Sequence, residues 1–297
     1  MLLPPALNKH SVIGLIAPSR KVDKNEIDFA INWIQSLGYE VVCDDRVFAE
    51  HHQFAGDDKL RSSLVQDYIY SPDIDVLWFV RGGYGALRVL DFVDFTPLLS
   101  RPKWVVGYSD ATAFHGRLQR LGLASLHAAM PVGLANNSDA SRDLLVSSLE
   151  GKPLRYCIEP HEMNRHGVGI GEVVGGNLSV LYSLLGSDAF PPTDGKILFL
   201  EDLDEYIYHI DRMVLALRRA GKLNNLAGLM VGGMTQMHDN KVPFGESAES
   251  VIRSHVDAFD YPVCMNFPAG HFIDNRPIVL GKCASIMVSA GEVVFQQ

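Results

Sequence analysis

The chain has 297 residues, of which 47% are hydrophobic and 21% charged, a balance that excludes an intrinsically disordered or low-complexity protein. This length predicts about two domains, with enough buried surface to fold without a disulfide or a metal. The 26 Lys and Arg residues against 35 Asp and Glu residues give a formal net charge of −9, so neither nucleic acid nor an anionic membrane surface is an expected partner.

In the first half of the chain, short apolar runs alternate with segments of helical periodicity. The apolar runs predict strands at residues 12–17, 40–43, 74–80 and 104–106. The helical patterns that follow them cover residues 25–37, 59–70, 86–92 and 110–121. Repeated strand–helix units predict a parallel sheet covered by helices on both faces, so residues 1–150 are expected to form an N-terminal α/β domain.

The second half of the chain has a different character. Polar stretches with turn formers lie between residues 140 and 170, and they predict a linker at residues 151–168. Beyond the linker, the expected elements are strands at 196–200 and 226–231, helices near 178–185 and 207–217, and a hairpin at 285–295. Residues 169–297 are therefore expected to form a smaller mixed β/α domain with more antiparallel pairing.

A serine lies where one predicted strand gives way to a helix, in the sequence Gly-Tyr-Ser-Asp-Ala at residues 107–111. The dipole of the following helix would stabilise negative charge near Ser109. The arrangement is similar to the nucleophile elbow G-x-S-x-G, with Ala111 in the last position. The alternative is a simple helix cap, because Ser and Asp are common N-cap residues.

A glycine cluster at residues 81–85 also lies between a predicted strand and a helix. Its backbone N–H groups could approach an anion or an oxyanion closely, although a tight turn is the alternative. A dinucleotide site is not expected, because the G-x-G-x-x-G pattern lacks its last glycine and residues 103–107 contain no acidic side chain.

Acidic and histidine side chains in the second half offer partners for a serine. The acidic run at residues 201–205 follows a predicted strand and could orient a histidine, although a solvated loop is the alternative. Among the eleven histidines, His271 lies in a loop beside Gly270 and is a candidate base. His161 and His166 lie five residues apart, which does not match the zinc motif, so no metal or other cofactor is expected.

Six ordered motifs together resemble the LD-carboxypeptidase family of serine peptidases, over essentially the whole chain. The motifs are residues 13–19, 81–85, 107–110, 175–178, 200–202 with 211–212, and 270–271. The fold expected with this resemblance is α/β, with an N-terminal flavodoxin-like parallel-sheet domain and a smaller C-terminal mixed β/α domain of the swivelling β/β/α type.

The resemblance implies a serine triad and an oxyanion hole. The implied catalytic residues are Ser109, Glu201 and His271. Glu205 lies four residues beyond Glu201 and is a rival for the carboxylate role. The implied oxyanion donors are the backbone N–H groups of Asp110 and of Gly82 or Gly83. Because the serine and the glutamate–histidine pair fall in different predicted domains, the site would form only where the domains meet.

The family's substrate is the murein tetrapeptide, cleaved between the L-centre of a diamino acid and the terminal D-alanine. Such an enzyme binds a free carboxylate, for which the candidates are the N–H groups after Gly176 and Asn177, and Arg81. Tyr84 and Glu205 are further candidates for substrate contacts. Family members often carry an aromatic residue before this Gly-Gly-Asn segment, whereas this chain has Val174. Relatives often dimerise, so the resemblance also implies a homodimer.

Three other functions remain open at this point. A related peptidase could cleave a peptidyl–nucleotide antibiotic, as the microcin C immunity peptidases do, although the missing aromatic at Val174 argues against stacking a nucleobase there. A non-catalytic module could bind a small anion through residues 81–85. An α/β-hydrolase esterase is disfavoured by Ala111.

The cysteines and the N-terminus predict where the protein acts. The four cysteines are scattered without a CxxC pair, which is typical of a reducing compartment. Pro4 and Pro5 lie where a signal peptide would have its apolar core, and no stretch is apolar enough to span a membrane. A cytoplasmic protein is therefore expected.

Overall fold

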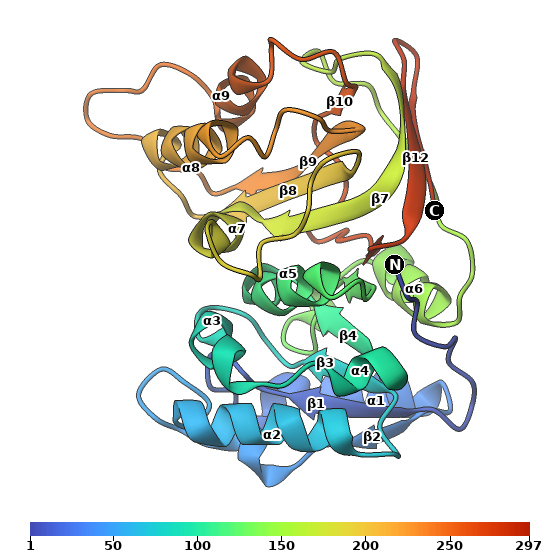
Figure 1. Ribbon diagram of the computed structural model, residues 1–297. Helices are drawn as coiled ribbons and strands as arrows, with labels where there is room; N and C mark the ends of the chain where they lie inside the picture. The colour runs from blue at the N-terminus through green and yellow to red at the C-terminus, as the bar shows by residue number, and fades with distance from the viewer.

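The computed structural model describes all 297 residues, arranged as two units that each contain one sheet (Figure 1). The first sheet has the order β2-β1-β3-β4-β5-β11. Its strands are β1 (Val12–Ile16), β2 (Glu40–Val42), β3 (Val76–Phe79), β4 (Trp104–Gly107), β5 (Ser125–His127) and β11 (Ile278–Leu280). The first five strands are parallel in the flavodoxin-like order 2-1-3-4-5, and β11 pairs antiparallel with β5 at the edge. The predicted fold class is confirmed for this unit.

Helices cover both faces of this sheet. They are α1 (Lys24–Ser36), α2 (Asp58–Tyr70), α3 (Ala86–Val89), α4 (Pro97–Ser100), α5 (Thr112–Arg120) and α6 (Asp139–Leu149). Because β2 and β3 lie on opposite sides of β1, right-handed crossovers place α1 and α2 on opposite faces. The helix predicted at 86–92 is α3 followed by a 3₁₀ turn, η2 (Leu90–Phe92).

The second sheet has the order β10-β9-β8-β7-β12-β13-β6. Its strands are β6 (Arg155–Ile158), β7 (Gly167–Asn177), β8 (Ile197–Leu203), β9 (Gly228–Thr235), β10 (Val263–Cys264), β12 (Cys283–Val288) and β13 (Val293–Gln296). Strands β7 to β10 pair in parallel, whereas β7, β12, β13 and β6 pair antiparallel. This mixed sheet and the β12–β13 hairpin agree with the prediction.

Three helices pack on the second sheet: α7 (Leu178–Leu184), α8 (Ile207–Arg219) and α9 (Ala248–His255). Helix α5 of the first unit lies between the two sheets, against β7 and α7 (Figure 1). One continuous hydrophobic cluster runs through both units. The two units are therefore packed together along α5, whose N-terminal end follows the predicted nucleophile.

The strands do not follow the predicted domain boundaries in two places. Strand β6 lies within residues 151–168, which were expected to form only a linker, and it pairs with β13. Strand β11 comes from the C-terminal part of the chain but completes the first sheet. Both pairings join residues far apart in sequence, so local patterns carried no signal for them.

None of the helices combines the length and the apolar composition that crossing a bilayer requires.

Candidate active site

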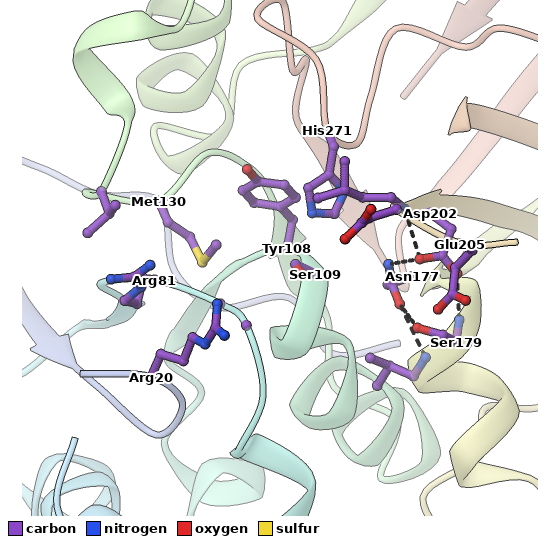
Figure 2. A pocket seen from close by; sticks show the side chains of 16 residues that line it. Arg20, Arg81, Tyr108, Ser109, Met130, Asn177, Ser179, Asp202, Glu205 and His271 are labelled. Atoms are coloured by element: carbon purple, nitrogen blue, oxygen red, sulfur yellow. Dashed lines mark hydrogen bonds between the residues drawn. The ribbon is translucent and has the colours of Figure 1, made fainter. Parts of the chain in front are cut away.

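A cavity of about 470 Å³ opens where the two units meet, at the carboxyl ends of β3 and β4. Figure 2 shows Ser109, Tyr108 and His271 in its centre. Arg20 and Arg81 lie on one side, and Asn177, Ser179, Asp202 and Glu205 lie on the other (Figure 2). The position agrees with the rule that ligands bind outside the carboxyl ends of strands in open α/β sheets.

Ser109 lies in a sharp turn, the 3₁₀ segment η3 (Ser109–Ala111), between β4 and α5. Its φ of +62° is unusual for a residue other than glycine. Such strained backbone is found most often at functional sites. The Ser109 hydroxyl forms no cap hydrogen bond at the start of η3 or α5. The helix-cap alternative for Ser109 is therefore wrong, and its hydroxyl faces the cavity.

His271 and Glu201 form a buried pair. The Nδ1–H of His271 donates to Oε2 of Glu201 over 2.6 Å, and the Glu201 side chain is completely buried. Gly270, with a φ of +111°, makes this close approach possible, because a Cβ atom there would lie 2.8 Å from Oε2 of Glu201. The ring of Tyr108 lies beside the imidazole, with ring centroids 4.8 Å apart. Only the Nε2 edge of His271 is left to act on a ligand.

Glu205 has a different partner. Its Oε2 lies 2.6 Å from Nδ1 of His209, one helical turn along the chain. Glu205 lines the cavity but is not bonded to His271. Of the two carboxylates considered from the sequence, the one that contacts the histidine is Glu201.

The interaction between Glu201 and His271 lowers the pKa of the carboxylate and raises the pKa of the imidazole. Burial opposes charge on Glu201, but its interactions with His271 outweigh burial and hold the pKa of Glu201 below its usual value. Burial also opposes protonation of His271, yet the Glu201 charge and hydrogen bond outweigh it and raise the pKa of His271. The pair thus stabilises an imidazolium, which is the state a base reaches after accepting a proton.

This raised pKa predicts the acidic limb of the pH–rate profile. A base must be neutral to accept a proton, so kcat/KM should fall as the pH drops through the pKa of His271, at a pH above the usual histidine value of about 6.5. In the Glu201→Gln variant only burial remains of the main causes, so the limb should move to lower pH. Profiles of both proteins between pH 5 and 9 test this, and a limb that stays in place or moves upward would contradict it.

Three backbone N–H groups near Ser109 are free to bind an oxyanion. No carbonyl or side chain accepts from the N–H of Gly82, Gly83 or Asp110. Gly82 packs directly against the serine, since a Cβ atom there would lie 3.1 Å from Oγ of Ser109. These are the three positions expected from the sequence. Their lack of partners fits a role as preorganised donors.

The Asp110 side chain ties the surrounding loops together. Its Oδ2 accepts from Oγ of Ser19 over 2.5 Å and from the backbone N–H of Ala86 over 2.8 Å. Buried Arg61 donates to the carbonyls of Pro18 and Gly85 from the other side. The segment after β1, the glycine loop and the nucleophile turn are therefore held in one hydrogen-bonded network.

The Gly-Gly-Asn segment at the end of β7 contacts the first unit. The backbone N–H of Asn177 donates to Oγ1 of Thr112 over 2.9 Å, and that of Gly175 donates to Oε1 of Gln119 over 3.2 Å. Both acceptors belong to α5. These bonds fix the second unit against the helix that begins just after Ser109.

Two N–H groups at the start of α7, where a carboxylate site was predicted, already have partners within the protein. The backbone N–H of Ser179 already donates to Asp202 over 2.9 Å, and that of Val180 donates to Oδ1 of Asn177 over 3.2 Å. Nδ2 of Asn177 also donates to Asp202 over 2.9 Å. Burial, together with the charge of Glu201, raises the pKa of Asp202 to about 7. The occupied donors of Ser179 and Val180 favour a different position for the carboxylate of a ligand.

Replacing Gly176 tests how closely the two units approach. Its φ is +141°, and a Cβ atom would lie 2.5 Å from Oγ1 of Thr112. Gly176→Ala is expected to lower the free energy of unfolding by about 1–3 kcal/mol, as measured by chemical denaturation. Gly186→Ala is the control. Gly186 has a φ of +84° and open space around it, so its replacement shows the free-energy cost of the positive φ without a steric clash. Equal effects of the two variants would contradict a close contact at Gly176.

The remaining sequence candidates have mixed outcomes. Arg81 lines the cavity, but its guanidinium donates to the carbonyl of Lys21 over 3.0 Å and lies 3.6 Å from Glu26. Tyr84 packs on Phe54, at 6.1 Å between ring centroids, and does not line the cavity. Val174 is fully buried in β7, so no substrate wall exists at that position. The structure brings together no cluster of metal-ligating side chains.

Several cavity residues were not predicted from the sequence, among them Arg20 and Asp202. Arg20 follows β1 in an irregular segment and carries no motif of its own. Asp202 belongs to the acidic run, in which the resemblance implied Glu201 as the partner of His271. Nothing in the sequence indicated that Asp202 would bind the Gly-Gly-Asn turn.

Comparison with known proteins finds one family along most of the chain. Residues 13–128 match the family model described as the LD-carboxypeptidase N-terminal domain, and residues 170–286 match the model of the LD-carboxypeptidase C-terminal domain. A probable murein peptide carboxypeptidase of Bacillus subtilis is 29% identical over 99% of this chain and 94% of its own length.

Solved structures are similar over nearly the whole chain. A muramoyltetrapeptide carboxypeptidase from Oxalobacter formigenes has a TM-score of 0.88 at 27% identity, covering 96% of this chain and 98% of that one. The microcin C7 self-immunity protein MccF, known from Escherichia coli, has a TM-score of 0.88 in its complex with glutamyl sulfamoyl guanosine. At 20% identity, with 100% of this chain and 99% of that chain covered, the latter likeness concerns the fold alone.

Proposed function

Because the chain belongs to the LD-carboxypeptidase family, we propose that it hydrolyses the L,D-peptide bond that releases terminal D-alanine from the murein tetrapeptide. The observation that carries this proposal is the assembly of Ser109, the free N–H groups and the His271–Glu201 pair around one cavity. Each unit supplies part of it, so the site depends on the packing of the two units.

In the proposed reaction, His271 takes the proton of Ser109 through Nε2 as the hydroxyl attacks the scissile carbonyl carbon. Glu201 holds the Nδ1–H and stabilises the imidazolium that forms. The Ser109 hydroxyl forms no hydrogen bond in this structure, so it must come within hydrogen-bond distance of His271 when substrate binds.

The N–H groups of Asp110 and of Gly82 or Gly83 then bind the oxyanion of the tetrahedral intermediate. His271 returns the proton to the leaving amine, and the C–N bond breaks to release the terminal amino acid. Water, activated by His271, hydrolyses the resulting acyl-enzyme and restores Ser109.

The charge distribution of the cavity supports a diamino-acid substrate. Asp202 and Glu205 lie on the side away from Arg20 (Figure 2). The Glu205 carboxylate on that side complements the side-chain ammonium of a diamino acid, and the opposite cationic side complements a free carboxylate. A murein tetrapeptide carries both groups around the bond to be cleaved.

All four cysteines are free thiols, which supports a reducing compartment. We place the enzyme in the cytoplasm, acting on small wall peptides during cell-wall recycling.

Cleavage of a peptidyl–nucleotide is the second candidate, because the microcin C7 self-immunity protein of Escherichia coli is 23% identical over 73% of this chain. Of the residues lining the cavity, Tyr108 is the one aromatic residue, and it packs against His271. Little aromatic surface is therefore left to stack a nucleobase, which supports the tetrapeptide instead.

Parallel assays of the purified protein with murein tetrapeptide and with aspartyl sulfamoyl adenosine, which is bound to MccF in a solved structure, separate the two candidates. A higher kcat/KM for the tetrapeptide is expected. A higher kcat/KM for the nucleotide conjugate would favour the second candidate.

A further inference from the structure

The cavity contains two guanidinium groups on the same side, those of Arg20 and Arg81 (Figure 2). Arg81 is already engaged by the carbonyl of Lys21 and by Glu26. Arg20 has no hydrogen bond or ion pair within the chain. We propose that Arg20 binds the free terminal carboxylate of the substrate and so restricts the site to cleavage at the end of a peptide. This inference rests on the carboxypeptidase function proposed above.

The side chain of Arg20 lies against the oxyanion loop. A Cβ atom on Gly83 would collide with Cδ of Arg20, and a Cβ atom on Gly82 would lie 3.1 Å from Oγ of Ser109. The glycine loop thus lies between Arg20 and the nucleophile and contacts both. The carboxylate of a terminal residue is only three bonds from the scissile carbonyl carbon. Its binding site must therefore adjoin the oxyanion loop, where Arg20 lies.

The backbone that carries Arg20 is held in place. Oγ of Ser19 donates to Asp110 over 2.5 Å, and the N–H of Lys21 donates to the carbonyl of Gln53 over 3.0 Å. The residues on either side of Arg20 are therefore fixed to the first unit, while its guanidinium remains free. A preorganised, unpaired guanidinium is suited to bidentate recognition of a carboxylate.

The opposite side of the cavity excludes the reverse orientation. A terminal carboxylate placed there would face Glu205 and be repelled by like charge. Binding at Arg20 therefore directs the leaving amino acid toward the first unit and the acyl part toward the acidic side. Arg20 sets both the orientation of the substrate and the requirement for a free chain end.

The test compares two substrates that differ only at the carboxylate: the murein tetrapeptide and the same peptide ending in D-alaninamide. Arg20→Ala should lower kcat/KM for the acid by about 10- to 100-fold, mainly through KM, because a hydrogen-bonded charge pair is lost. The kcat/KM for the amide should change less than about threefold. Arg20→Lys, which keeps the charge but not the planar fork, should lie between Arg20→Ala and wild type.

Lys21→Ala is the matched control, because Lys21 carries the same charge on the next residue but pairs with Glu50 and does not line the cavity. It should leave both substrates unaffected. An equal loss for acid and amide in Arg20→Ala, or an acid-specific loss in Arg81→Ala alone, would overturn the proposal for Arg20. If the wild type cleaves neither substrate, the proposed function itself fails, and this inference fails with it.

Discussion

Ser109→Ala is expected to lower kcat for D-alanine release by about 10⁴- to 10⁶-fold, the range seen when the nucleophile of a serine triad is removed. The oxyanion donors and the substrate contacts remain in the variant, so KM should change little. The loss follows from the absence of an acyl acceptor and not from a damaged site. Single-turnover assays with excess protein measure a rate this low.

The stability of the variant separates chemistry from folding. The Ser109 hydroxyl forms no hydrogen bond in the structure, so Ser109→Ala should keep the free energy of unfolding within about 0.5 kcal/mol of the wild-type value. Ser183→Ala is a suitable control, because Ser183 is an exposed serine on α7 outside the cavity. A Ser109→Ala variant that retains a tenth of the wild-type kcat would contradict the nucleophile assignment.

Glu201→Gln is expected to lower kcat by about 10⁴-fold, as does removal of the charge from the acid of a serine triad. The variant keeps nearly the same shape, so packing around the buried side chain should persist. It loses the negative charge that stabilises the imidazolium of His271. It also permits the wrong tautomer, because the amide group can donate a hydrogen bond to Nδ1.

Glu205→Gln makes the same chemical change four residues away and is the matched control for Glu201→Gln. Glu205 is bonded to His209 rather than His271, so the control should retain kcat within about tenfold. An effect on KM is expected instead, since Glu205 lines the cavity. If Glu205→Gln lowers kcat more than Glu201→Gln does, the assignment of the carboxylate is wrong.

Local periodicity predicted most of the strands and helices that pair with near neighbours in sequence. The β1-to-β4 series and the β12–β13 hairpin came from apolar runs and turn residues. Strand β7 was not predicted, because its Gly-rich sequence weakens any strand pattern. Strand β11 joins a sheet begun more than 200 residues earlier, and long-range pairing of this kind leaves no local pattern.

The site residues, unlike the strands and helices, could not be predicted from local patterns alone. Taken alone, the residues around Ser109 fitted a helix cap as well as a nucleophile, and the resemblance to a family decided between these alternatives. The structure adds which donors are already hydrogen-bonded within the protein and which are free to bind a ligand. Arg81 and the start of α7 are weaker candidates for the carboxylate site because some of their donors are already occupied. Arg20 became a candidate only because no partner lies near it.

The central claim is that this protein removes terminal D-alanine from a murein tetrapeptide, and the most direct measurement is the product analysis of that reaction. Purified wild-type protein is incubated with tetrapeptides that end in D-alanine or in L-alanine, and the released amino acid and the remaining peptide are identified by mass spectrometry. We expect free D-alanine and intact tripeptide, with the L-alanine peptide cleaved far more slowly. A folded protein that leaves the D-alanine tetrapeptide uncleaved would contradict the account.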